Sequence, residues 1–219
     1  MKWLKKFASI LLQLSFMIVL PFILIIRGSV YLYEHHNWNH WLSMIVMFAI
    51  AFVLLLIYTV MIYDWLFGEN KVSRKGLKVQ SIIVMSILLL YGGYTLINLS
   101  GANAKTPQVR EEFTSLHPLL RMSVGTVLFL DQKLLVTDMS RGKEDYKKMG
   151  LKTLKHSLHY PQKDGYVHAM DLRTNDRSEI RNRLLQFYFW SMGFNTLRHV
   201  GTADHLHISL TSRDNPASI

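Results

Sequence analysis

The sequence predicts three transmembrane α-helices followed by a small α+β domain with an antiparallel sheet. Three apolar segments before residue 100 reach the roughly 20 residues that a helix needs to cross a bilayer core about 30 Å thick. Beyond residue 100 the composition becomes that of a water-soluble fold. That second part combines short strand-like runs with one helical pattern that ends at a glycine, which is typical of an α+β domain.

The membrane part is expected to cover residues 1–99, with helices at about 7–26, 41–63 and 82–99. Pro21 is expected to kink the first helix, and Gly92 and Gly93 to permit close packing of the third. The basic start of the chain also suits a cleaved signal peptide. The first apolar stretch is too long for a usual signal core, however, and no small-residue cleavage pattern follows it, which favours a retained anchor.

The distribution of basic residues predicts the orientation. The first loop carries only Arg27, whereas the N-terminus and the second loop carry several cations: Lys2, Lys5, Lys6, Lys71, Arg74, Lys75 and Lys78. The N-terminus is therefore expected in the cytoplasm of a bacterium. The C-terminal domain is expected on the periplasmic or extracellular side of the plasma membrane.

Composition excludes several classes of function. The chain has no cysteine, which rules out disulfides and thiolate sites. Its net charge is +10, but several of the basic residues sit at helix ends, where membrane topology accounts for them, so no nucleic-acid partner is expected. No charged residue lies inside a predicted span, which argues against a transporter. A first-loop cluster is better explained by interfacial side chains than by a metal site: His35, His36, Trp38, His40 and Trp41.

Residues 100–108 are expected as a linker, and residues 109–219 as the domain. The predicted elements are a helix at 109–120, a hairpin of strands 123–130 and 133–138, a helix at 143–149, and a strand at 167–172. A helix then runs to Met192, capped by Asn175 or Asp176 and closed by Gly193, with strands following at 195–200 and 205–211. The apolar positions of this last helix are expected in the core: Ile180, Leu184, Leu185 and Tyr188.

Two histidine-rich stretches suggest a metal site. The first reads Ser-Leu-His at 157–159, then a glycine-containing loop and Ala-Met-Asp at 169–171, and the second reads Asp-His-Leu-His at 204–207. A catalytic zinc needs three protein ligands and one open position, which His159, Asp171 and His207 would supply. On a strand, Asp204 points away from the face of His207. It must therefore sit at the strand entry to reach the metal.

These motifs resemble those of the zinc D-Ala-D-Ala carboxypeptidases and L-alanyl-D-glutamate endopeptidases, a superfamily that also contains vancomycin-resistance D,D-dipeptidases and the hedgehog signalling domain. The resemblance covers about residues 134–210. It implies a small α+β fold, Zn²⁺ bound by His159, Asp171 and His207, Asp204 as general base, and Arg141 as a contact for the substrate carboxylate. The His159–Asp171 interval is longer than the family's, so His156 and His168 remain alternative ligands.

The expected function is that of a membrane-anchored zinc peptidase with peptidoglycan peptides and the lipid bilayer as partners. Its cut would lie next to a D-amino acid, as the resemblance implies. One alternative is a non-catalytic protein that binds cell wall or partners in a membrane complex. Another is a membrane-disrupting lysis factor of phage type.

Overall fold

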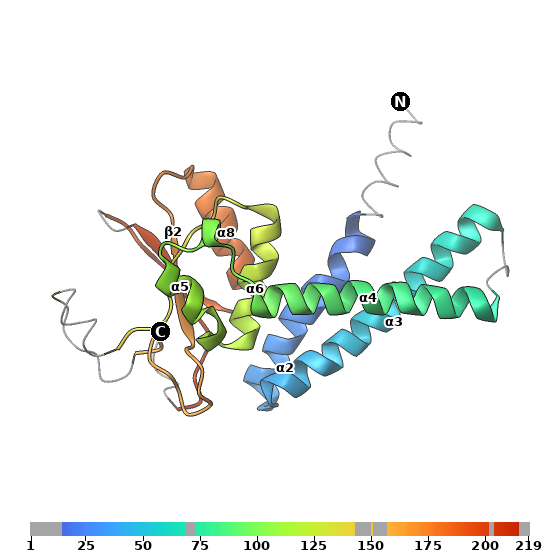
Figure 1. Ribbon diagram of the computed structural model, residues 1–219, viewed down its shortest axis with the longest axis horizontal. Helices are drawn as coiled ribbons and strands as arrows, with labels where there is room; N and C mark the ends of the chain where they lie inside the picture. Colours follow the sequence, from blue (N-terminus) through green and yellow to red (C-terminus); the bar gives the residue numbers. More distant parts are fainter. Residues whose placement is uncertain (1–14, 69–72, 143–149, 151–156, 202–203, 215–219) are drawn as a thin grey trace. The chain divides into compact units, whose positions relative to one another are not determined.

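The computed structural model describes residues 15–68, 73–142, 150, 157–201 and 204–214 (Figure 1). The chain divides into two compact units, residues 1–91 and residues 92–219. The predicted fold class is confirmed: three long apolar helices precede a small domain with a four-stranded antiparallel sheet. The predicted helix at 143–149, His156 and the basic residues Lys2, Lys5, Lys6 and Lys71 lie outside the described residues.

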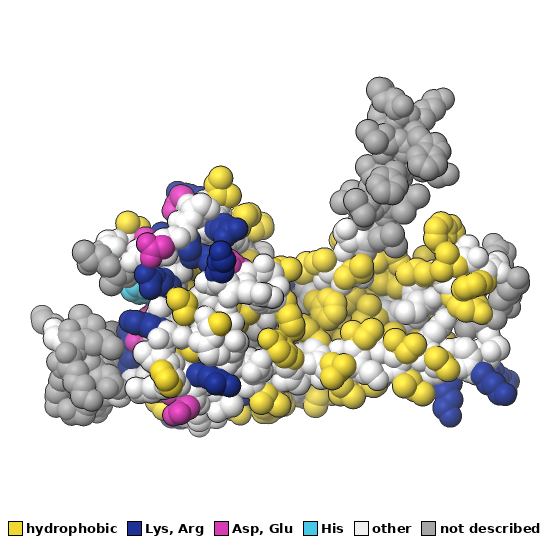
Figure 2. Space-filling view, turned by 45° about the horizontal axis from the view of Figure 1, so that its top comes forward, with side chains coloured by type: hydrophobic (Ala, Val, Ile, Leu, Met, Phe, Trp, Pro, Cys, Tyr) yellow, Lys and Arg dark blue, Asp and Glu magenta, His cyan; other side chains and the backbone are white. Residues whose placement is uncertain are grey.

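Three helices are long and apolar enough to cross a membrane: Ser15–His36, His40–Phe67 and Arg74–Ile97. The first contains a π-helical turn, Leu24–Gly28, which continues as α2 (Ser29–His36). The other two are α3 (His40–Phe67) and α4 (Arg74–Ile97). Hydrophobic side chains cover much of the visible surface of these helices (Figure 2), as expected of surfaces that face lipid.

The first helix continues to His36 rather than ending at Ile26, which corrects its predicted boundary. Arg27, expected in a loop, therefore lies inside the helix. Buried Val30 and Tyr33 extend its apolar face past this cation, whose long side chain can reach toward water. The connection is only residues 37–39, where the side chain of Asn39 accepts hydrogen bonds from the first turn of α3.

The domain begins with short helical segments and one longer helix. They are the 3₁₀ turn η2 (Gly101–Asn103), α5 (Pro107–Glu111), the 3₁₀ turn η3 (Glu112–Ser115) and α6 (Pro118–Leu130). Residues 100–108, expected as a linker, are attached to the domain. The amide of Asn103 donates to the carbonyl oxygens of Gln132 and Leu134, and Lys105 N donates to Val136 O.

The predicted hairpin is wrong in its first half, because residues 123–130 belong to α6. Pro118 occupies the first turn of this helix, where its missing N–H costs nothing, and His117 Nδ1 accepts a hydrogen bond from Leu119 N. Valine and threonine in this run favoured a strand, but tertiary packing overrides that preference. All but one of the residues at 118–128 are buried.

α6 crosses the last turns of α4, which belong to the same unit. Arg121 Nη1 donates to Leu96 O at 2.7 Å, and the rings of Phe129 and Tyr94 lie 4.7 Å apart. Between them, Gly125 lies so close to Thr95 that a Cβ on the glycine would stand 2.9 Å from Thr95 Cα. Successive residues of α4 thus meet positions of α6 about one turn apart, so the helices cross instead of running side by side.

The sheet has the order β1-β2-β4-β3, with every neighbouring pair antiparallel. Its strands are β1 (Val136–Asp138), β2 (Ala169–Arg173), β3 (Asn195–His199) and β4 (His205–Ser209). The last three confirm predicted strands to within two residues. One face carries the core side chains Val136, Met170, Leu172, Leu206 and Ile208. The opposite face carries the polar side chains of β2 and β4.

The long helix of the domain is α8 (Glu179–Met192). Gly193 closes it in the left-handed conformation, φ 100°, as predicted. Its N-cap is Ser178, not Asn175 or Asp176. The core expectation holds for Leu185, which is 4% exposed, but is wrong for Ile180 and Leu184, which are 74% and 61% exposed.

Candidate metal centre

The pairing of β2 with β4 brings two of the predicted ligands together. Asp171 lies directly opposite His207 in the antiparallel register. Directly opposed residues point to the same face of a sheet, so the register alone makes these side chains neighbours. His207 Nδ1 lies 2.8 Å from Asp171 Oδ1.

The third predicted ligand, His159, comes from the turn that precedes β2. His159 N donates to Ser157 Oγ, and the chain on either side is attached to neighbouring segments. Arg141 N donates to His159 O, and His168 N donates to Leu158 O. These bonds hold the imidazole beside the Asp171–His207 pair although twelve residues separate His159 from Asp171.

The three potential ligand atoms lie close to one another. His159 Nε2 is 3.4 Å from His207 Nδ1 and 3.6 Å from Asp171 Oδ1. A tetrahedral zinc ion with bonds of about 2.0–2.1 Å separates its ligand atoms by about 3.4 Å. Both His159 distances match this value, and the His207–Asp171 distance is that of a hydrogen bond. The exposed fractions of His159, Asp171 and His207 are 4%, 3% and 9%.

The histidine rings present suitable nitrogens. His159 Nδ1 lies 2.6 Å from the carbonyl oxygen of Met139. A carbonyl oxygen accepts only, so Nδ1 carries a proton, and in a neutral ring Nε2 then carries the lone pair that a metal needs. In His207, Nδ1 faces the other two ligand atoms and donates a hydrogen bond to the Asp171 carboxylate, so a metal there would have to displace that proton. Its Nε2 is buried and has no hydrogen-bond partner among the described residues.

Asp171 is held in its ionised form. Burial raises the pKa of its carboxyl, but hydrogen bonds and favourable charge interactions with His159 and His207 outweigh that effect. The pKa of Asp171 therefore lies well below its usual range, as a metal ligand requires. Its second oxygen, Oδ2, accepts a hydrogen bond from Arg141 Nη2.

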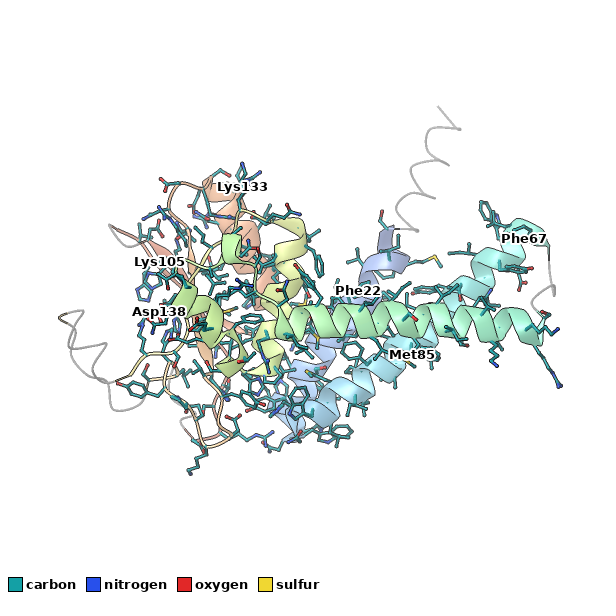
Figure 3. The ribbon with its side chains drawn as sticks, in the orientation of Figure 1. Phe22, Phe67, Met85, Lys105, Lys133 and Asp138 are labelled. Carbon is teal, nitrogen blue, oxygen red and sulfur yellow. The ribbon has the colours of Figure 1, made fainter. Side chains whose placement is uncertain are left out.

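Arg141, predicted as a contact for the substrate carboxylate, bridges two aspartates. Its Nε donates to Asp138 Oδ2 at 2.7 Å, and its Nη2 donates to Asp171. Asp138 ends β1 (Figure 3). The guanidinium, 18% exposed in its side chain, thus orients one potential ligand. A substrate carboxylate would have to share it with these two acids.

Asp204, predicted as the general base, is directed toward a different set of partners. Its two oxygens accept from Arg198 Nε and Nη2 at 2.6 and 2.7 Å, and Thr174 Oγ1 donates at 2.6 Å. Since Leu197 opposes His207, Arg198 points to the other face of the sheet. The Arg198 hydrogen bond lowers the pKa of Asp204 to about 2, with Thr174 adding to the effect.

Two further histidines lie on the metal-facing side of the sheet. The rings of His199 and His205 stack at 4.7 Å, and His205 Nε2 is 3.9 Å from Asp171 Oδ2. Burial, and then the neighbouring histidines, lower the pKa of His199. The strand alternation could have revealed this pair from the sequence, whereas the Met139 carbonyl left no sequence signal.

A second histidine cluster differs from the first in its hydrogen bonds. His168 Nε2 is 2.9 Å and His117 Nε2 is 3.8 Å from Asp164 Oδ2. His117 Nδ1 accepts the hydrogen bond of Leu119 N, so in a neutral ring the proton is on Nε2 and that nitrogen cannot ligate. His168, the alternative ligand, therefore belongs to an acid–imidazole network, while in the first-loop cluster His35 and His36 contact the ring of Tyr31.

The geometry of this centre brings together the same three residues that the motif of the two histidine-rich stretches indicates. No protein-family model matches the chain, and neither the curated proteins nor the solved structures that were searched contain a significant match.

Proposed function

We propose that this protein is a membrane-anchored zinc peptidase that cleaves peptide stems of bacterial peptidoglycan next to a D-amino acid. The observation that carries the proposal is the convergence of His159 Nε2, Asp171 Oδ1 and His207 Nδ1. These are the residues that the resemblance to the zinc carboxypeptidases and endopeptidases assigns as ligands. The Met139 carbonyl, which fixes the ring of His159 so that Nε2 faces the other two ligand atoms, supports the proposal further.

In this proposal the chain's own residues hold and orient the reacting groups. A bound zinc ion supplies Lewis acidity, which polarises the scissile carbonyl and lowers the pKa of water. His159, Asp171 and His207 hold the metal, and the Met139 carbonyl fixes the ring of His159. Arg141 keeps Asp171 in place and would contact the substrate carboxylate, as the resemblance implies.

Asp204 distinguishes a catalytic domain from one that only binds peptides, because catalysis needs this residue as general base and binding does not. As general base it would have to leave Arg198 and Thr174 and turn toward the metal-facing side of β4. Its observed pairing with Arg198 favours a second candidate function, a zinc-containing domain that binds cell-wall peptides without cutting them. Both functions need the same three ligands, so they are separated by turnover and not by metal content.

We also propose that the domain faces away from the cytoplasm, in the periplasm or at the outer face of a bacterial plasma membrane. Arg74, Lys75 and Lys78 lie in the first turns of α4, and the domain follows its other end. The positive-inside rule puts the basic end in the cytoplasm. Peptidoglycan lies on the opposite side, where the domain would meet its substrate.

The test uses the full-length protein in lipid nanodiscs with purified muropeptides, and mass spectrometry identifies the products. Cleavage is expected with zinc, is lost with a chelator, and returns when zinc is restored. Asp171→Asn should abolish it, whereas His199→Ala, on the same face of the sheet, should retain zinc and most activity. Cleavage that survives the chelator would contradict the proposal, and full zinc occupancy with peptide binding but no turnover would establish the non-catalytic alternative.

A further inference from the structure

α8 is apolar on two opposite faces. Leu185, Phe189 and Met192 are buried against the sheet. At about 100° per residue, a second set of large apolar residues forms a stripe on the other side of the helix: Ile180, Leu184, Phe187 and Trp190. Each of these four is at least 61% exposed. We call this set the α8 stripe. A soluble domain rarely exposes such a row without a function for it.

The apolar surface continues at the C-terminal end of α6. Phe129 and Leu130 are 50% and 84% exposed. The two helices run antiparallel, because Tyr188 Oη donates to Ser123 O at 2.9 Å and Arg177 pairs with Asp131 just beyond the end of α6. The start of the α8 stripe and the exposed end of α6 therefore lie at the same end of this helix pair.

The end of α6 is in turn connected to a membrane-spanning helix. The ring of Phe129 contacts Tyr94 of α4, and Ile97 in the last turn of α4 is 71% exposed. Apolar side chains thus lead from the end of a membrane span onto α6, which crosses that end.

A basic cavity of about 610 Å³ lies where α6 ends and α8 begins. Its cationic lining residues are Lys133, Arg173, Arg177 and Arg181. Asp131 neutralises Arg177, and Asp176 neutralises Arg173. No ion pair among the described residues uses Lys133 or Arg181, so the cavity keeps a net positive charge. Lys133 projects from the edge of the domain (Figure 3).

From these observations we propose that the α6–α8 face docks on the surface of the bilayer that α4 crosses. The α8 stripe, with Phe129 and Leu130, enters the boundary between headgroups and acyl chains. The basic cavity receives the phosphate of an anionic lipid. The inference rests on the membrane anchor and does not require peptidase activity.

A lipid surface fits this face better than a protein partner does. Helices that lie in a membrane interface typically carry tryptophan and phenylalanine on one side and arginines beside them. α8 has this composition. The contacts of α6 with the last turn of α4 also keep the face near the bilayer, which gives an effective concentration on the order of millimolar. Weak contacts then suffice for docking.

Because the chain has no cysteine, single labels can test the docking. Leu184→Cys and Phe187→Cys in the full-length protein would each carry a nitroxide, in vesicles of phosphatidylethanolamine and phosphatidylglycerol. Val200→Cys, 83% exposed outside the stripe, is the control. Both stripe labels should collide readily with lipid-soluble oxygen and poorly with a water-soluble nickel complex, and the control should show the reverse.

Two results would overturn docking. Stripe labels as accessible to nickel as the control would show that the face is in water, and protection from both reagents would show that it is covered by protein. Adding Ile180→Glu or Trp190→Glu to a labelled variant should lower the docking equilibrium constant by at least about tenfold for each substitution. Equal docking on pure phosphatidylcholine vesicles would refute the anionic-lipid role of the cavity.

Discussion

The imidazole Nδ1 of His159 and the carbonyl oxygen of Met139 are 2.6 Å apart. In a neutral ring this contact leaves the lone pair on Nε2, the nitrogen that faces Asp171 and His207. In the His117–Asp164–His168 network, His117 Nδ1 accepts a hydrogen bond from Leu119 N. The proton of a neutral His117 ring is therefore on Nε2, the reverse of the arrangement in His159. The two clusters contain the same residue types, and their hydrogen bonds and burial differ: Asp171 is buried, whereas Asp164 is exposed.

Zinc should stabilise the full-length protein through this centre. At free zinc about 100 times its dissociation constant, binding contributes about 2.7 kcal/mol, which raises the melting temperature by about 5–10 °C. The shift should vanish in His159→Ala and His207→Ala and persist in His199→Ala. Differential scanning fluorimetry in detergent measures it, and an equal shift in all four proteins would place zinc elsewhere.

Asp204→Asn should leave zinc binding intact, because the Asp204 carboxylate pairs with Arg198 on the other face of the sheet. Loss of this charge-assisted pair should lower the free energy of unfolding by about 1 kcal/mol. Metal analysis and thermal melts measure the two quantities. Loss of zinc from this variant would mean that Asp204 turns toward the metal in solution.

The Asp131–Arg177 pair should make stability depend on pH. Its hydrogen bond with Arg177 lowers the pKa of Asp131 below the ordinary value of 3.8. A depressed pKa contributes stability above that ordinary value and loses it as the pH falls through the folded-state pKa. The melting temperature of wild type should therefore exceed that of Asp131→Asn at neutral pH, and the difference should disappear in strong acid.

A matched control for this pH dependence is Asp176→Asn, which disrupts an ion pair whose aspartate side chain is 81% exposed. An exposed pair contributes about 0–1 kcal/mol, so its substitution should shift the melting temperature less. Equal effects from the two substitutions at every pH would refute a special role for Asp131.

Gly125→Ala should destabilise the domain relative to Gly93→Ala. Both substitutions replace a helical glycine and gain similar helix propensity. Only at Gly125 does the new Cβ meet another chain segment, Thr95, whereas at Gly93 it meets open space. The difference in the free energy of unfolding should be about 1–3 kcal/mol, measured by thermal melts, and its absence would show that the crossing of α6 and α4 loosens readily.

The sequence predicted best where one strong local signal decides the structure. Long apolar runs yielded the three spans, and Gly193 marked the end of α8. The strands that carry His207 and Asp171 were predicted from the alternation of polar and apolar residues and from the short length of the apolar runs. The predicted ligands are brought together, because the β2–β4 register makes Asp171 and His207 neighbours as soon as both strands form.

The wrong predictions concern residues whose structure depends on contacts between segments far apart in the sequence. The strand-like run 123–130 became helical because Gly125 and its neighbours pack on α4. Ile180 and Leu184 have helical spacing but lie on the face of α8 turned away from the sheet, and spacing alone does not tell which of two apolar faces is buried. The direction of Asp204 depended on Arg198, a partner on another strand.

The seating of Gly125 on Thr95 has a practical consequence for recombinant work. A fragment trimmed where hydropathy falls, at about residue 101, would lack Tyr94, Thr95 and Leu96 and leave the side of α6 that they cover bare to solvent. Such a fragment is expected to aggregate even if its sheet folds. Crystallisation trials should therefore keep the end of the third helix and add detergent to shield it.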